Sequence, residues 1–188
     1  MNARTSLALV AGSCAVLVLA FPRILSAQQP PAACTAAEHR QFDFWVGVWE
    51  VSVGTQVAGI NTITRENNGC VVVERWAGAQ GLTGTSLNVY HAPTKRWHQT
   101  WVDSAGSLLL LDGEFKDGAM RLASPTQGAK VLHRVTWTPN ADGGLRQLWE
   151  QSTDGGAKWT VAFDGLYRRK AGAADSAAQS ASAWAARE

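Results

Sequence analysis

Aromatic and polar side chains alternate along several segments of this chain. In residues 97–103, Trp97, Gln99, Trp101 and Asp103 occupy every second position, so they share one face of an extended strand. Aromatic rings offer contact area to a small molecule, and a few amide or carboxylate groups fix its orientation. The candidate binding residues with this alternation are Glu74, Trp76, Asn88, Tyr90, Gln99, Trp101, Asp103, Gln147 and Trp149.

The alternation does not decide what this face contacts. An exposed row of tryptophans would lower solubility, which favours an interior or interface position for the rings. Two interiors stay open: a cavity that holds a ligand, and a filled core with amides at the surface, since small barrels can be packed solid.

Acid–base chemistry is an alternative use of the same residues. Glu74, Asp103 and Tyr90 would form a proton-transfer site if they met in a dry interior, where burial raises the pKa of a carboxyl group. The nucleophile-elbow, zinc-protease, phosphate-loop and dinucleotide motifs do not occur in the sequence. We therefore assign no catalytic residue and keep an enzyme as the alternative to a binding protein.

Short strands must position these side chains. From Val46 onward, runs rich in Val, Thr, Trp and Tyr alternate with Gly, Asp, Asn and Pro clusters, a pattern typical of an all-β sandwich or barrel. The expected strands are Val46–Val53, Gly59–Arg65, Cys70–Ala77, Thr83–His91, Arg96–Asp103, Ser107–Phe115, Ala119–Ala123, Val131–Thr138, Leu145–Ser152 and Trp159–Arg168.

Turn chemistry indicates how these strands are joined. Asp117-Gly118, residues 140–144 and Asp154-Gly155-Gly156 are typical of hairpins, because Asp, Asn and Gly accept the positive φ of tight turns. Many antiparallel strands in one small domain must hide their edges, which closure does completely. We predict an all-β, antiparallel up-and-down barrel of about ten strands with a short N-terminal helical cap.

One of these turns matches the Asp-box pattern Ser-x-Asp-x-Gly-x-x-Trp, from Ser152 to Trp159. We expect Ser152 and Asp154 to bind backbone N–H groups of the turn while Trp159 packs against it, which is a structural role. A propeller would need repeated blades of about 40–50 residues, and the sequence contains no such repeat.

The segments outside the barrel differ in composition. Residues 1–27 contain a basic start, an apolar run from Leu7 to Phe21 and a small-residue end at Ala27, as in a secretory signal peptide. Residues 28–41 are expected to form a linker or cap, residues 42–169 the barrel domain, and residues 170–188 an Ala- and Ser-rich disordered tail. We therefore expect an exported protein, periplasmic or extracellular, with no membrane insertion after cleavage.

Cys34 and Cys70 remain after removal of this leader. Exported proteins reach an oxidising compartment in which paired thiols oxidise, so a disulfide is the default expectation. A metal pair is the weaker alternative, because the histidines do not supply further ligands at zinc spacing. We expect no metal.

The net charge of the chain says little about its binding partners. Two of its 17 basic residues, Arg4 and Arg23, lie in the leader, which leaves 15 basic residues against 15 acidic ones. A neutral domain lacks the basic surface by which proteins bind nucleic acid or anionic membranes, so we expect neither partner. The oligomeric state is left open.

The run from Phe42 to Val51, with Gly47 two residues before Trp49, resembles the first-strand motif of the calycins, the superfamily of lipocalins, fatty-acid-binding proteins and nitrobindins. With Gly69-Cys70, Glu74-x-Trp76, the Trp97–Asp103 run and Tyr167, it looks like a family of uncharacterised secreted bacterial lipocalin-like proteins. The resemblance covers about residues 42–169. The expected count of about ten strands resembles that of the fatty-acid-binding and nitrobindin branch more than that of the eight-stranded lipocalins.

The resemblance implies roles for single residues. Gly47 and Trp49 would form the barrel floor, with Arg168 or Arg169 packed across Trp49. An inward Arg134 would anchor a carboxylate ligand, as in fatty-acid-binding proteins, although an outward arginine is the more common case. Nitrobindins bind haem through a late histidine, which leaves His133 as the alternative haem ligand here; otherwise we expect no cofactor.

The leading hypothesis is an exported lipocalin-like protein that binds a small, partly apolar molecule, such as an aromatic compound, in the barrel. The alternatives are an enzyme that uses the same cavity, and a structural or protein-interaction barrel without a ligand. The sequence does not identify the ligand.

Overall fold

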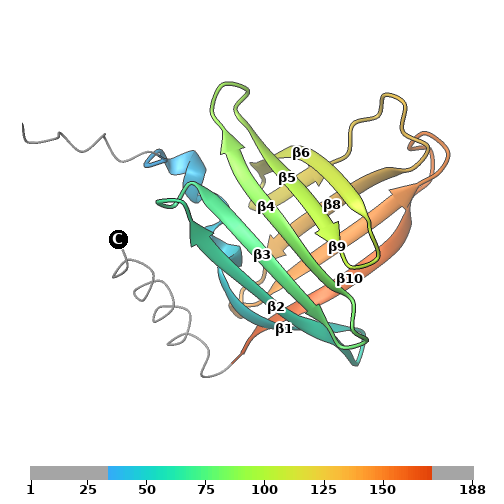
Figure 1. The fold of residues 1–188 in the computed structure, drawn as a ribbon, viewed down its shortest axis with the longest axis horizontal. Coiled ribbons are helices and arrows are strands. Elements are labelled where there is room, and N and C mark those ends of the chain that lie inside the picture. The colour runs from blue at the N-terminus through green and yellow to red at the C-terminus, as the bar shows by residue number, and fades with distance from the viewer. Residues whose placement is uncertain (1–33, 171–188) are drawn as a thin grey trace, which may run out of the picture. The chain divides into compact units, whose positions relative to one another are not determined.

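A computed structural model describes residues 34–170 of the chain, which form two short 3₁₀ turns and ten strands. Figure 1 shows their arrangement. The elements are η1 (Ala37–Arg40), η2 (Asp43–Trp45), β1 (Gly47–Val53), β2 (Gln56–Glu66), β3 (Val71–Gly78), β4 (Thr83–His91), β5 (Arg96–Asp103), β6 (Leu108–Lys116), β7 (Ala119–Ala123), β8 (Leu132–Pro139), β9 (Leu145–Ser152) and β10 (Thr160–Arg169).

The ten strands close into one antiparallel barrel. Each strand pairs with the next along the chain, and β1 pairs with β10 to complete the ring, with Val51 opposite Tyr167. We call this β1–β10 pairing the seam. The predicted fold class and strand count are confirmed; the largest difference in the strand starts is in β2, which begins at Gln56 instead of Gly59.

The hairpins follow the chemistry of their turns. Asp117 and Gly118 both have positive φ, 51° and 74°, which suits a two-residue turn between β6 and β7. In the Asp-box, the hydroxyl of Ser152 accepts from the backbone N–H of Gly156 at 2.8 Å, and the Asp154 carboxylate accepts from that of Lys158 at 2.9 Å. The motif therefore stabilises the β9–β10 turn, as expected.

One end of the barrel, which we call the closed end, is filled with aromatic side chains. Phe42 and Trp45, from the turns before β1, stack at 4.7 Å between ring centroids and are fully buried. Trp137 contacts both rings from β8, and Trp97 contacts Phe42 from β5. The closed end of the barrel is thus an ordinary packed core.

The N-terminal cap is held to this end by two kinds of bond. A disulfide joins Cys34 to Cys70, just before β3, as expected. Arg65 on β2 forms an ion pair with Asp43 and donates a hydrogen bond to the carbonyl of His39 at 2.9 Å. The expected helical cap consists of the two 3₁₀ turns at the blue end of the ribbon, and no side chain caps the start of η1 (Figure 1).

Gly47, Trp49 and Arg169 meet where the seam reaches the closed end. The guanidinium of Arg169 lies 4.3 Å above the Trp49 ring and donates to the carbonyl of Val46 at 3.2 Å. Gly47 has a φ of 144°, which residues with a side chain rarely adopt, and a Cβ there would also displace this guanidinium. Both explain the glycine two residues before the tryptophan. Of the two arginines that the sequence offered, Arg169 is the one that packs across Trp49.

We expect Arg169→Met to lower the free energy of unfolding by about 1 kcal/mol, because it removes a cation–π contact and a hydrogen bond at the seam. Urea denaturation followed by intrinsic fluorescence measures this loss. Arg168→Met is the matched control, since Arg168 is exposed and makes no cation–π contact with Trp49. Equal losses in the two variants would contradict a specific role for Arg169.

Some expectations fall outside the described part of the chain. The leader at residues 1–27, the linker residues 28–33 and the tail after Lys170 are not among the described residues. Within residues 34–170, no helix has the length and apolar character that crossing a membrane requires.

Candidate functional site

A cavity of about 340 Å³ occupies the barrel interior at the end opposite the aromatic core. Its rim includes Val57 and Leu82, which are 51% and 42% exposed, so this is the open end. Most of its wall is aromatic or aliphatic: Trp76, Trp101, Leu109, Val135, Trp149 and Phe163. The volume lies near the lower limit for sites that bind small molecules.

Glycines make room for this cavity. A Cβ on Gly84 would collide with the Trp101 ring, one on Gly59 with Trp76, and one on Gly165 with Phe163. The three rings therefore lie directly against the strand backbone at these glycines, closer than a residue with a Cβ would allow.

Polar side chains form the inner part of the cavity. Glu74 on β3 is 4% exposed, and its two carboxylate oxygens accept one hydrogen bond each, from the Asn61 amide and the Ser86 hydroxyl, both at 2.7 Å. Asn61 and Ser86 are fully buried. Because its neighbours β2 and β4 supply these donors, the carboxylate is held in one orientation.

Hydrogen bonds extend from Glu74 in both directions around the barrel. On one side, Asn88 donates to Ser86 at 2.9 Å and Gln99 donates to Asn88 at 2.8 Å. On the other, Asn61 donates to the Tyr167 hydroxyl at 3.1 Å, and that hydroxyl donates to Gln147. The members of this polar network, in order, are Gln147, Tyr167, Asn61, Glu74, Ser86, Asn88 and Gln99.

Burial changes the acid–base properties of the network. Loss of hydration raises the pKa of Glu74 to about 7, against the smaller opposing effect of its hydrogen bonds from Ser86 and Asn61. Burial, helped by the Glu74 charge, raises the pKa of Tyr167 well above its usual value. Glu74 is therefore the group of this network that changes charge near neutral pH.

Several polar atoms here have unused hydrogen-bonding capacity. An ionised carboxylate has about four lone-pair positions, and Glu74 uses two of them within the described residues. Gln147 accepts from Tyr167, but its amide nitrogen donates to no described residue. The cavity thus offers acceptor sites at Glu74 and a donor at Gln147.

The structure gathers most of the nine candidate binding residues. Six of them line the cavity: Glu74, Trp76, Gln99, Trp101, Gln147 and Trp149.

Asn88, Tyr90 and Asp103 are not among the lining residues. Asn88 belongs to the buried network behind the wall, and Tyr90 packs against Trp97 and His39 toward the closed end. Asp103 accepts from the Trp101 indole at 3.2 Å and from backbone N–H groups of the turn after β5. The acid–base set of Glu74, Asp103 and Tyr90 is therefore not assembled in the cavity.

Sequence reasoning missed Asn61, Phe163 and Tyr167 as site residues. The alternation of Phe163, Gly165 and Tyr167 was the available signal, since a glycine between two inward aromatic residues leaves space for a ring. Asn61 gave no such signal, because a single amide in a strand of β-branched residues has many uses.

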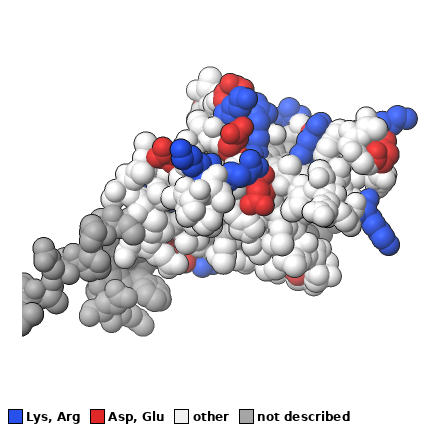
Figure 2. All heavy atoms as spheres, turned by 90° about the horizontal axis from the view of Figure 1, so that it is seen from above, with Lys and Arg blue, Asp and Glu red and all other residues white. Residues whose placement is uncertain are grey.

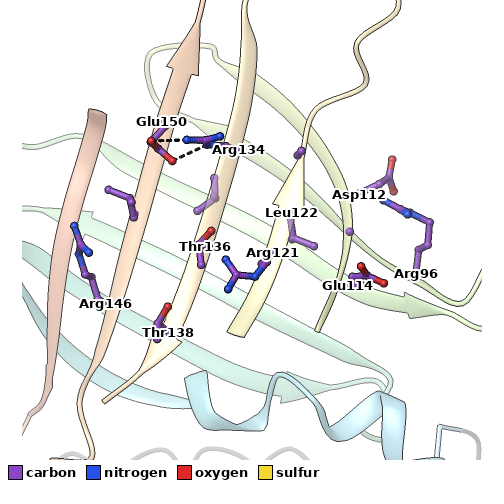
Figure 3. A pocket seen from close by; sticks show the side chains of 14 residues that line it. Arg96, Asp112, Glu114, Arg121, Leu122, Arg134, Thr136, Thr138, Arg146 and Glu150 are labelled. Atoms are coloured by element: carbon purple, nitrogen blue, oxygen red, sulfur yellow. Dashed lines mark hydrogen bonds and ion pairs between the residues drawn. The ribbon is translucent and has the colours of Figure 1, made fainter. Parts of the chain in front are cut away.

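Arg134 points away from the cavity. It forms a two-pronged ion pair with Glu150, at 2.6 and 2.8 Å, and lies over the Trp159 ring at 4.2 Å. Figure 3 shows this pair on the outer face of β8 and β9. The carboxylate-anchor role considered for Arg134 inside the barrel is therefore wrong.

This outer face has a hollow of its own, of about 550 Å³, lined by charged side chains of β5 to β9. Arg134 and Arg146 are paired with Glu150 and Asp164. Figure 2 shows that basic and acidic side chains lie beside one another on the face of the molecule that it presents. Within the described residues, Arg96, Arg121 and Glu114 of the same lining form no ion pair. Because the lining carries charges of both signs on an open surface, it has no one-sided charge that would select a ligand.

His133, the histidine considered as a haem ligand, does not line this cavity. Its Nδ1 accepts the indole N–H of Trp149 at 3.1 Å. Burial also lowers the pKa of His133. Within residues 34–170, no three His, Cys, Asp or Glu side chains cluster as metal ligands would.

Comparisons of this chain with protein-family models and with curated proteins find no match. The ten-stranded antiparallel barrel is compatible with a calycin-like fold.

Proposed function

We propose that this protein binds a small, partly apolar molecule in the open half of its barrel, as an exported lipocalin-like carrier. The observation that carries the proposal is the contrast between the two halves. One half is filled by Phe42, Trp45 and Trp137, whereas the other keeps a cavity of about 340 Å³ behind an exposed rim.

The composition of the wall supports binding over a purely structural role. A barrel that needed only stability would gain from filling this space, because buried voids lose contact energy. Here glycines hold three aromatic rings against the wall, and polar groups converge at the inner end. This combination of apolar area and a few oriented polar groups is typical of small-molecule sites.

Native mass spectrometry of the protein isolated from its own source tests the proposal. We expect a mass above that of the polypeptide which disappears on denaturation. The excess gives the molecular weight of the carried molecule. A bare polypeptide, together with no response to aromatic reporters, would contradict a carrier.

A single substitution tests the cavity directly. In Gly84→Ala the new Cβ collides with the Trp101 ring, which must then move into the cavity. We expect the affinity for the uncharged reporter N-phenyl-1-naphthylamine to fall roughly tenfold, since each 1.4 kcal/mol of lost contact is a factor of ten. Reporter fluorescence measures it, and Thr85→Ser, on the exposed face of the same strand, is the control.

Glu74 favours one alternative, an enzyme that acts in the same cavity. A carboxyl group with a pKa of about 7 can both accept and donate a proton at neutral pH. It would serve as the acid–base residue, with Tyr167 and Gln147 to orient a substrate. Turnover of a molecule recovered from the native protein, lost in Glu74→Gln, would establish this alternative.

A further inference from the structure

The cavity that the described residues form has a one-sided charge. Of its lining side chains, Glu74 and Tyr167 are the two that ionise, and both become negative. Lysine, arginine and histidine are missing from the lining. Arg134, considered from the sequence as an inward anchor for a carboxylate, forms an ion pair with Glu150 on the outer face. An anionic ligand would therefore meet a carboxylate and no counter-charge.

The Glu74 carboxylate is itself short of positive partners. Its two hydrogen bonds come from an amide and a hydroxyl, which are neutral donors. A buried carboxylate is stabilised far more by a cation than by neutral donors. The remaining lone pairs of Glu74 thus provide a place for a positively charged ligand group.

The wall fits the same kind of ligand. Trp76, Trp101 and Trp149 border the space in front of Glu74, and tryptophan is the aromatic side chain that attracts cations most strongly to its face. The amide of Gln99, a neighbour of Ser86 in the network, adds a carbonyl oxygen that accepts no hydrogen bond from a described residue. Aromatic faces and oxygen acceptors surround one end of the cavity.

We propose that the ligand of this cavity is a small protonated amine with an aromatic or similarly flat apolar group, whose ammonium pairs with Glu74. The proposal rests on the proposed function and specifies its ligand class. The apolar group lies between the tryptophans, and the ammonium donates to Glu74 and to Gln99.

Other titratable groups around the cavity keep a constant charge near neutral pH. Burial keeps Tyr167 protonated, because its pKa is raised. Backbone N–H groups of the β5–β6 turn lower the pKa of Asp103, which stays ionised behind Trp101. Burial lowers the pKa of His133, which stays neutral behind Trp149. Ionisation of Glu74 is therefore the step that should govern amine binding.

Three probes with the same ring and different charge test the ligand class: 2-phenylethylamine, 2-phenylethanol and phenylacetate. Isothermal titration calorimetry measures their affinities for the purified protein at about pH 8, where Glu74 is ionised and the amine is protonated. We expect the amine to bind about tenfold or more tightly than the alcohol, and phenylacetate to bind least, because charge-assisted hydrogen bonds are the strong ones.

A variant and a pH series test whether Glu74 causes the preference for the amine. Glu74→Gln should abolish the preference for the amine over the alcohol, whereas the matched control Glu114→Gln, at an exposed position on β6, should keep it. In the unmodified protein the preference should also disappear at about pH 5, where Glu74 is protonated. If Glu74→Gln does not fold, the pH series still tests whether the preference depends on a group that titrates between about pH 5 and about pH 8.

The outcomes separate the two proposals. If the alcohol binds as well as the amine, or phenylacetate binds best, the ligand class is wrong while binding in the cavity stands. If the amine preference persists in folded Glu74→Gln or at about pH 5, Glu74 is not the anchor. If none of the three probes binds and N-phenyl-1-naphthylamine gives no signal, both proposals fail.

Discussion

Replacing Trp45 with alanine is expected to lower the free energy of unfolding by about 3–5 kcal/mol, the usual cost of truncating a buried tryptophan. Trp45 is fully buried between Phe42 and Trp137. Its own indole nitrogen has no partner among the described residues, so the loss is one of packing. Urea denaturation should show a lower midpoint with an unchanged slope.

Leu108→Ala is the control for this variant, because Leu108 is 65% exposed. We expect its stability to stay within about 0.5 kcal/mol of the unmodified protein. Reporter binding should persist in Trp45→Ala at temperatures where the variant is folded, since Trp45 does not line the cavity. A loss below about 1 kcal/mol would show that the aromatic core relaxes around the gap.

The second large effect is a dependence of stability on pH. Glu74 has a pKa of about 7 when folded, against 4.5 for a free glutamate, so the folded state keeps a proton that the unfolded chain releases. Stability is therefore highest below about pH 4.5 as far as this group is concerned, and falls as the pH rises toward 7. The loss is on the order of 3 kcal/mol.

Glu74→Gln removes this titration while keeping the shape of the side chain. We expect the difference in stability between the variant and the unmodified protein to move in favour of the variant as the pH rises from about 4.5 to about 7. Urea denaturation across this range measures it. Glu114→Gln should leave the pH dependence unchanged; if Glu74→Gln does so as well, the carboxylate is ionised in the fold throughout.

Strand positions were predictable because each strand carries its signals locally. The Asp117-Gly118 turn and the alternation from Trp97 to Asp103 specify where a strand ends and which side chains share a face. Local pattern also placed Trp101 and Gln99 on one face of their strand, without deciding whether that face lies inside the barrel. It could not say that Tyr90 and Asp103, on the same inward faces, lie beyond the two ends of the cavity.

The polar network was beyond sequence reasoning for a different reason. Asn61 and Tyr167 are 106 residues apart and meet because β10 closes onto β1, a register that no local pattern encodes. The orientation of Arg134 was equally hidden. Its partner Glu150 is on the neighbouring strand, and only the pairing of β8 with β9 brings the two together.

The seam also bears on the order of folding. Every pairing except β1–β10 joins strands that are consecutive in the sequence, so those hairpins close short loops, whereas the seam closes nearly the whole domain. Tyr167 reaches Asn61 only across that last closure. A ligand bound at Glu74 should therefore stabilise the β1–β10 pairing. We expect it to slow hydrogen exchange more at the β1 and β10 amides than at the amides of the other strands.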